Sequence, residues 1–139
     1  MKNITQRQLN AIIAKHKLYI DGIDINARAV FRGINLSGLD MTNQDLRYAH
    51  FDGAEMLGTD LRGADLSFAS FQNALLLCVD LSHATLRCTD FTGAQIIESE
   101  MMYCDCSSAF LHNTRLAGTN LLGCTGLSYR AEREYENSK

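Results

Sequence analysis

Proline and tryptophan are both absent from this chain of 139 residues, and no long apolar run occurs in it. Proline cannot donate a hydrogen bond to a backbone ladder, so its absence suits a fold in which most segments pair with backbone on both sides. The apolar run near Ile12 is broken by Lys15 and Lys17 and is too short to span a membrane. The sequence therefore predicts neither a signal peptide nor a membrane contact.

Catalytic motifs are also missing. The chain has no glycine-rich phosphate loop, no nucleophile elbow and no paired metal-binding motif. The four histidines are scattered along it, at His16, His50, His83 and His112. The sequence therefore predicts a protein that is not an enzyme, with no catalytic residue, no cofactor and no metal site.

Five cysteines without a secretory signal predict reduced thiols in a cytoplasm. The repeat described below places Cys104, Cys106 and Cys124 inward and Cys78 and Cys88 at outward corners. A disulfide between Cys104 and Cys124 is conceivable, and three inward thiols could suggest a metal, but no inward histidine completes a tetrahedral set. The preferred interpretation is that these thiols act as small buried hydrophobes.

Charge is unevenly distributed around a formal net value of −3. Residues 1–28 carry five basic and two acidic side chains, a net charge of +3, whereas residues 29–128 carry five arginines and eleven acidic side chains, a net charge of −6. Direct nucleic-acid binding requires a basic stripe. The sequence therefore predicts no direct nucleic-acid partner for the acidic stretch.

The positive signal is a five-residue period that runs from Ala29 to Ser128 without losing register. Every fifth residue from Phe31, named here the centre of its repeat, is apolar until Gly126, and the residue two positions earlier is mostly small. This spacing fits neither a helix, which has about 3.6 residues per turn, nor a strand, which has a period of two. Residues two apart share one side of a short extended segment, the next three turn a corner, and four corners close a coil of 20 residues.

Phenylalanines test the four-sided interpretation, because residues 20 apart would stack in neighbouring coils. Phe31, Phe51, Phe71 and Phe91 share one such register, and no other centre is a phenylalanine. We therefore predict a continuous aromatic column inside the coil. The leucine centres predicted to surround it in the core are Leu61, Leu66, Leu76, Leu81 and Leu86.

Stretches such as Ala64-Asp65-Leu66-Ser67-Phe68 and Thr59-Asp60-Leu61-Arg62-Gly63 resemble the A(D/N)LXX motif of the pentapeptide repeat family. The resemblance covers residues 29–128 and implies the fold of that family, an all-β, right-handed quadrilateral parallel β-helix. Twenty repeats of five residues would make about five coils, and a rod roughly 24 Å long at about 4.8 Å per coil.

Residues 1–28 precede the repeat and are predicted to form an N-terminal helical cap, because the open end of a solenoid needs a cover. Thr5 is a candidate N-cap for a helix from Gln6 to about Leu18. The predicted divisions are therefore a cap at 1–28, a β-helix at 29–128, and a C-terminal cap or tail at 129–139 that begins with a short helix.

Two sets of outward residues are candidate binding surfaces. An apolar stripe and an apolar patch near the C-terminal end could bind a partner or a second copy, unless the tail or the N-terminal helix covers them. Two acidic columns could imitate DNA phosphates, unless the carboxylates belong to the motif itself and bond corner backbone. The apolar set is Leu57, Leu77 and Ile97 with Met102, Leu122 and Leu127; the acidic set is Asp40, Asp60, Asp80 and Glu100 with Asp45, Asp65 and Asp105.

The preferred functional hypothesis is a non-enzymatic protein–protein interaction module that forms a homodimer. The family resemblance implies pairing through the C-terminal ends, which favours the patch with Leu122 and Leu127 over the stripe. Short family members from phage and bacterial genomes are similar in opening with a helix, a segment like His16-Lys17-Leu18-Tyr19 and a turn like Gly22, which favours a phage or prophage origin. The alternative is a DNA mimic that binds a type II topoisomerase (gyrase), as some family members do. The chain resembles those members in acidity but has fewer repeats and no loop insertion.

Overall fold

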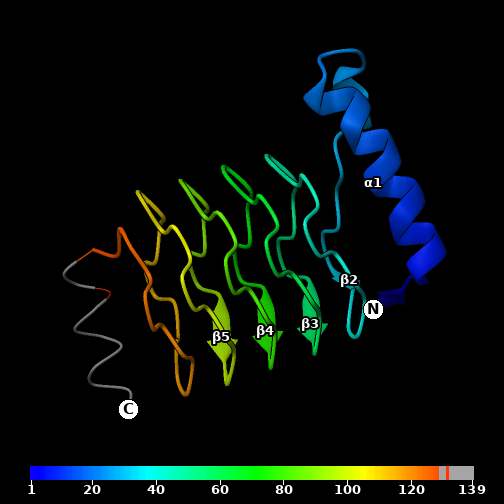
Figure 1. Ribbon diagram of the computed structural model, residues 1–139. Helices are drawn as coiled ribbons and strands as arrows, with labels where there is room; N and C mark the ends of the chain where they lie inside the picture. The colour runs from blue at the N-terminus through cyan, green and yellow to red at the C-terminus, as the bar shows by residue number, and fades with distance from the viewer. Residues whose placement is uncertain (129–130, 132–139) are drawn as a thin grey trace.

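The computed structural model describes residues 1–128 and 131, and it is a right-handed quadrilateral β-helix with a helix across its N-terminal end (Figure 1). In chain order the elements are β1 (Lys2–Asn3), α1 (Gln6–Ile20), the 3₁₀ helix η1 (Ile25–Ala27), β2 (Ile34–Asn35), β3 (Glu55–Leu57), β4 (Leu75–Leu77) and β5 (Gln95–Ile97). The five strands form one parallel sheet in the order β1-β2-β3-β4-β5. Among the described residues, no helix is both long and apolar enough to cross a bilayer. The predicted tail at 129–139 lies, apart from Ala131, outside the described residues.

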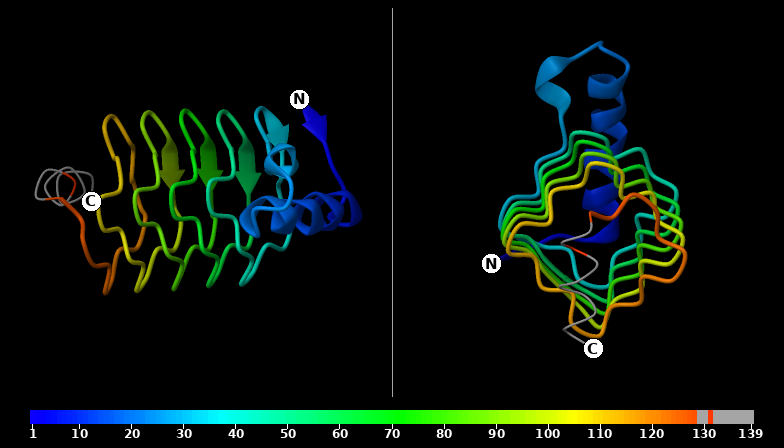
Figure 2. Two further views of the ribbon diagram at one scale, coloured as in Figure 1. Left: turned by 90° about the horizontal axis from the view of Figure 1, so that it is seen from above. Right: turned by 90° about the vertical axis from the view of Figure 1, so that its left-hand side faces the viewer.

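Each coil contains 20 residues, as the period predicted. Met56 pairs with Leu76, and Leu76 pairs with Ile96 in the next coil. Isolated bridges on the other sides keep the same spacing, for example between Asp45 and Asp65. Seen along the rod, successive coils therefore superimpose as nested four-sided outlines (Figure 2).

The corners are β-turns in which the carbonyl of a centre accepts a hydrogen bond from the N–H three residues later. At one corner Ala69 N donates to Leu66 O at 2.9 Å, and Phe68, the third residue of the turn, has φ +62°. A positive φ at this position is typical of a type II turn and favours glycine or asparagine. Eleven residues other than glycine nevertheless adopt it: Asn43, Tyr48, Phe68, Asn73, Cys78, His83, Cys88, Glu98, Tyr103, Ser108 and Asn113.

The core is a set of stacked columns, and the predicted core residues all lie in it. The rings of Phe31, Phe51, Phe71 and Phe91 follow one another at centroid distances of 5.0, 4.5 and 5.1 Å, and every one is fully buried. The remaining predicted core side chains are also fully buried: Leu61, Leu66, Leu76, Leu81 and Leu86.

Polar residues in the small inner row are satisfied by backbone. The Thr59 hydroxyl donates to Leu36 O at 2.9 Å, a centre carbonyl of the preceding coil. Thr89 and Thr114 make the same bond to the carbonyls of Leu66 and Phe91, each a centre 23 residues earlier. The thiols of Cys104 and Cys124 take the same place and donate to centre carbonyls at 2.9 and 2.7 Å. Threonine and cysteine therefore substitute for alanine here without leaving a buried donor unpaired.

Helix α1 begins at Thr5, whose side chain accepts from Gln8 N at 3.2 Å while the Gln8 side chain accepts from Thr5 N at 2.8 Å, a capping box. The helix ends at Ile20, two residues later than predicted. Its buried residues Leu9 and His16 face the first coil. The cap is therefore anchored through one face of α1.

The first coil carries larger inner side chains than the later coils, and these side chains pack beneath the N-terminal cap. Its inner row carries the larger Ile34, Leu39 and Gln44, where later coils carry mostly alanine and threonine, because no earlier coil fills the space above them. The Gln6 side chain donates to Asp40 O and accepts from Asp40 N, both at 2.8 Å. This amide replaces the backbone partner that a preceding coil would supply.

Candidate interaction surfaces

The apolar stripe predicted from the sequence lies on the face that carries the strands. Leu57, Leu77 and Ile97, named here the apolar ladder, are the last residues of β3, β4 and β5. Successive strand residues point to opposite faces, so they face outward while the middle residues of the strands are buried. Leu57 is 56 % exposed, and Leu77 and Ile97 are half-buried.

A shallow groove runs beside the ladder. It has a volume of about 330 Å³ and is lined mainly by Asn35, Ser37, Glu55, Leu57, Leu75 and Leu77. Helix α1 packs across the end of the first coil and leaves Leu57 open (Figure 1). The cap therefore does not cover the ladder, which removes one of the two covers considered from the sequence. The other, the tail, falls outside the described residues.

The side chains of the patch near the C-terminal end differ in their exposure. Leu122 is 61 % exposed, whereas Met102 and Leu127 are half-buried. Met102 and Leu122 stand one coil apart in a column that begins with Thr42 and Arg62. The patch therefore interrupts a polar column only in its last two coils.

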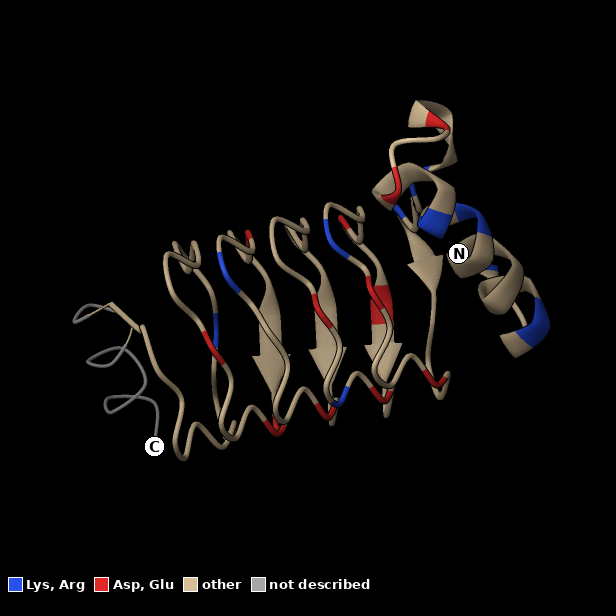
Figure 3. Ribbon diagram, turned by 45° about the horizontal axis from the view of Figure 1, so that its top comes forward, with Lys and Arg blue, Asp and Glu red and all other residues tan. Residues whose placement is uncertain are grey.

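One set of acidic residues recurs from coil to coil along one edge of the rod, and the others lie on its remaining sides (Figure 3). Most of their carboxylates bond the backbone two residues later. Asp65 Oδ1 accepts from Ser67 N at 3.0 Å, and Asp80 Oδ1 accepts from Ser82 N at 2.9 Å. The same bond is made by Asp40, Asp45, Asp60, Asp90 and Asp105. The carboxylates thus hold the backbone of the extended segment at each centre. This is the alternative to DNA mimicry that the sequence also allowed.

Arginines neutralise part of these columns. Arg62 pairs with Asp60 at 2.6 Å and reaches Asp80 at 3.8 Å. Arg47 pairs with Asp45 at 2.7 Å in the same way. The Arg62 side chain, by its hydrogen bonds, holds the pKa of the Asp60 carboxyl below its usual value. Beyond these pairs, Glu100 accepts from the Asn120 amide at 2.9 Å.

A serine, a histidine and an aspartate meet on another face, which the sequence did not indicate. The Ser70 hydroxyl donates to Asp52 Oδ1, and Asp52 Oδ2 accepts from Arg32 at 2.9 Å. His50 Nδ1 lies 3.0 Å from the Arg32 guanidinium and 3.4 Å from Asp52 Oδ2. A serine nucleophile needs a base that accepts its proton. Here the hydroxyl is bonded to the carboxylate and the imidazole faces Arg32, so the cluster is a hydrogen-bonded brace between coils.

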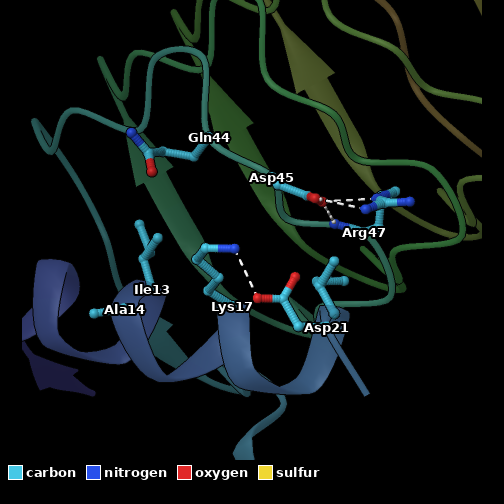
Figure 4. Close-up of a pocket in the computed structure, with 8 residues that line it drawn as sticks. Ile13, Ala14, Lys17, Asp21, Gln44, Asp45 and Arg47 are labelled. Carbon is cyan, nitrogen blue, oxygen red and sulfur yellow. Dashed lines mark hydrogen bonds and ion pairs between the residues drawn. The ribbon is translucent and has the colours of Figure 1, made fainter. Parts of the chain in front are cut away.

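A cavity of about 380 Å³ lies between α1 and the first coil (Figure 4). Ile13 and Ala14 line its apolar side. Its charged groups are already paired, because Lys17 contacts Asp21 and Arg47 contacts Asp45, both at 2.7 Å. No charge in it is left for an ionic ligand.

The inward thiols perturb one another: hydrogen bonds with Cys104 and Cys106 lower the pKa of the Cys124 thiol. Hydrogen bonding to the Cys124 sulfur, together with burial, raises the pKa of the Cys104 thiol well above its usual value and does the same for Cys106. Within residues 1–128, no three histidine, cysteine or acidic side chains are grouped to hold a metal ion. All five cysteines are free.

Comparison with known proteins supports the fold. The sequence pattern described as pentapeptide repeats matches residues 27–63 and 64–101, in eight copies. A pentapeptide repeat protein from the thylakoid lumen of Arabidopsis thaliana is 32 % identical, with 74 % of this chain and 73 % of that chain covered and a TM-score of 0.69. No curated protein matches the sequence.

Two further solved structures are more distant. Rfr23, a pentapeptide repeat protein of the cyanobacterium Cyanothece 51142, is 23 % identical over 68 % of this chain and 62 % of that chain, with a TM-score of 0.38. QnrB1, a plasmid-mediated fluoroquinolone resistance protein, is 17 % identical over 79 % of this chain and 70 % of that chain, with a TM-score of 0.41. Neither likeness carries an argument about function. The matched repeats and the coils they form nevertheless identify the chain as a member of the pentapeptide repeat family.

Proposed function

We propose that this pentapeptide repeat protein is a non-enzymatic protein-interaction module that self-associates through the apolar ladder. The observation that carries the proposal is the exposure of Leu57, 56 %, at a position where Ser37 stands one coil earlier. The coil itself requires no leucine or isoleucine there. Three consecutive coils with an outward aliphatic residue form a surface that water solvates poorly, and such surfaces usually mark contacts.

The energetics favour a symmetric pair. Full burial of an exposed leucine or isoleucine is worth about 1.5–3 kcal/mol. Association costs roughly 4–15 kcal/mol in lost translational and rotational freedom. One ladder alone contributes too little, because Leu77 and Ile97 are already half-buried. Two ladders, one on each copy, can offset the cost, and a two-fold dimer is the commonest way to bury both.

Sedimentation velocity at micromolar concentration tests this proposal. The natural chain is expected to sediment as a dimer, and Leu57→Glu as a monomer, because a buried unpaired carboxylate is costly. His112→Glu, an exposed change on another face, is the matched control and should stay dimeric. Leu122→Glu separates the ladder from the patch near the C-terminal end and should also stay dimeric. A monomeric natural chain, or a Leu57→Glu variant that remains a dimer, would contradict the proposal.

The alternative, a DNA mimic that binds gyrase, has one observation in its favour. Asp40, Asp60, Asp80 and Glu100 stand in one column, each bridged to the next. Two features weigh against it: the Arg62 side chain contacts Asp60 and Asp80 of that column, and most carboxylates already bond backbone N–H groups. We therefore rank mimicry second.

The remaining parts of the proposal concern the cellular compartment and the source of the protein. Five free thiols support a reducing compartment, for which we propose a cytoplasm. The opening segment His16-Lys17-Leu18-Tyr19 supports a phage or prophage origin. We also propose that the protein has no cofactor and no catalytic group.

A further inference from the structure

The face that carries β2, β3, β4 and β5 has two outward columns of side chains (Figure 1). The ladder column is the apolar ladder extended by one residue in the first coil and one in the fifth. The charged column stands two residues earlier in each coil, on the same side of the strands. From the first coil to the fifth, the charged column is Asn35, Glu55, Leu75, Gln95 and Arg115, and the ladder column is Ser37, Leu57, Leu77, Ile97 and Ala117.

The charged column holds one acid and one base, and both are exposed. Neither Glu55 nor Arg115 forms an ion pair with another described residue. The two residues lie three coils apart, roughly 14 Å at the spacing of neighbouring strands, so neither can neutralise the other within one chain. Arg115 differs in this respect from the other arginines of the rod, each of which contacts a carboxylate of its own chain: Arg32, Arg47, Arg62 and Arg87.

The ladder column changes in size over the same three coils. Leu57 is the most exposed of its aliphatic side chains, whereas Ala117 is the smallest of them and is half-buried. Layers that pack well set large side chains against small ones. A leucine at 57 and an alanine at 117 therefore match in size, at the separation at which Glu55 and Arg115 match in charge.

One symmetry operation satisfies both matches. A two-fold axis that lies between two such faces, parallel to the strands, brings them together with their coils in opposite order. If the axis passes between β4 and β5, the second coil of each copy faces the fifth coil of the other. Glu55 then faces Arg115 of the second copy, and the symmetry repeats the contact. An axis along the rod would instead set Glu55 against Leu57 of the second copy, a charge against an apolar side chain.

We propose that two copies pair face to face in this register, with Glu55 of each copy against Arg115 of the other. Leu57 of each copy then packs on Ala117 of the other. This inference rests on the self-association proposed above and adds the orientation and the register of the pair. Exposed ion pairs add little affinity, but complementary charges across an interface select the register in which two surfaces meet.

The apolar residues alone do not select this register, because both faces repeat at the same strand spacing. If the two-fold axis passes through β4 instead, Leu77 meets Leu77 of the second copy and apolar contacts remain. Glu55 then faces Gln95, and Arg115 faces Asn35, so that no opposite charges meet. The register with the axis between β4 and β5 is therefore the one that pairs all four charges.

Charge reversal in the full-length chain tests the register. Glu55→Arg alone sets a new base against Arg115 of the second copy, and Arg115→Glu alone sets a new acid against Glu55. The double variant, Glu55→Arg with Arg115→Glu, restores both pairs with their signs exchanged. Lys15→Glu, a reversal at an exposed position of α1, is the matched control. Far-ultraviolet circular dichroism melts establish that each variant is folded, and Glu55→Lys replaces Glu55→Arg if the latter unfolds.

Sedimentation velocity over a dilution series gives the dimer dissociation constant of each variant. We expect each single reversal to raise this constant roughly tenfold or more, because two attractive contacts become repulsive. The double variant should return close to the value of the natural chain. An equimolar mixture of the two single variants should form a mixed pair more tightly than either variant pairs with itself, because both of its charge contacts are attractive. High salt should reduce all these differences, and the control should match the natural chain.

The other outcomes contradict the inference in distinguishable ways. If the natural chain dimerises and Leu57→Glu is monomeric, but the charge reversals change nothing, the ladder is a contact surface and this register is wrong. A double variant that associates as weakly as the single variants would show that Glu55 and Arg115 do not face each other. A monomeric natural chain overturns both this inference and the proposed function, and leaves the face to a different protein.

Discussion

His16 Nε2 donates to the carbonyl oxygen of Arg47, 31 residues away in the sequence, at 3.0 Å. The other ring nitrogen, Nδ1, accepts from Ala29 N at 3.0 Å. Because Nδ1 is an acceptor, the proton of the neutral ring lies on Nε2. The fully buried imidazole thus joins α1 to two points of the first coil. The cap is held by a ring that must stay neutral.

The first prediction concerns pH. Burial lowers the pKa of His16 from its usual 6.5. The hydrogen bond to the Arg47 backbone and the charge of Asp45 oppose this shift, while the charges of Arg28 and Arg47 add to it. Since the folded-state pKa lies below the unfolded one, the unfolded chain binds more protons between the two values. Stability is therefore complete above the unfolded pKa and falls as the pH drops below it. Urea denaturation across mildly acidic to neutral pH should show this loss.

His16→Phe should be less stable than the natural chain at neutral pH, because it leaves Ala29 N and Arg47 O unpaired, and should lose most of the pH dependence. His83→Gln, at an exposed corner, should keep the dependence. An unchanged pH profile in His16→Phe would show that the linkage has another source.

The second prediction concerns the aromatic column. Phe71 is fully buried between Phe51 and Phe91. Phe71→Ala should lower the free energy of unfolding by about 3–5 kcal/mol through lost burial and a cavity. Gln72→Ala, next to it but exposed, should change it by about 0.5 kcal/mol or less. Equal effects at the two sites in chemical denaturation would be incompatible with this register.

The third prediction separates backbone strain from steric overlap. Gly58 and Gly126 both adopt positive φ, +63° and +74°. A Cβ at Gly58 would meet nothing within 4 Å, whereas one at Gly126 would lie 2.6 Å from the Ser107 backbone. Gly58→Ala should cost about 1–2 kcal/mol from left-handed strain alone. Gly126→Ala should cost about 1–3 kcal/mol more, because backbone cannot move aside. Thermal or urea unfolding would reveal the order, and the reverse order would refute the steric argument.

The fourth prediction concerns mimicry. We expect the natural chain to leave DNA supercoiling by gyrase unchanged at stoichiometric concentration, because Arg62 and the backbone bonds occupy the acidic columns. A combined Asp60→Asn, Asp80→Asn and Glu100→Asn variant should behave the same. Inhibition or protection by the natural chain that disappears in this variant would favour the DNA-mimic function.

Much of the fold could be predicted from the sequence because its five-residue period fits only one arrangement of the backbone, a four-sided coil. A five-residue spacing fits no helix or strand, and the four phenylalanines 20 residues apart fix four sides per coil. Both the β-helix and the helix on its N-terminal end are confirmed. The corner conformation could not be predicted, because Phe68 and Glu98 are residue types that disfavour the positive φ they adopt.

The surfaces were less predictable. The outward direction of Leu57 follows from strand alternation, but whether α1 lies over it depends on tertiary docking, which no local pattern encodes. The Asp–backbone bonds were one of two alternatives, and only coordinates distinguish them. An outer stack of Tyr48 on Phe68, at a centroid distance of 5.1 Å, was missed because neither residue stands at a centre or in the inner row. A search of the corner column at 20-residue spacing would have found it.

The central claim, that the apolar ladder is the contact surface, is tested most directly by methyl NMR across a dilution series of the natural chain. The account predicts that the methyl signals of Leu57, Leu77 and Ile97 shift with concentration in the micromolar range, while that of buried Leu81 stays constant. Signals that do not move, or a shift confined to Leu122, would contradict it.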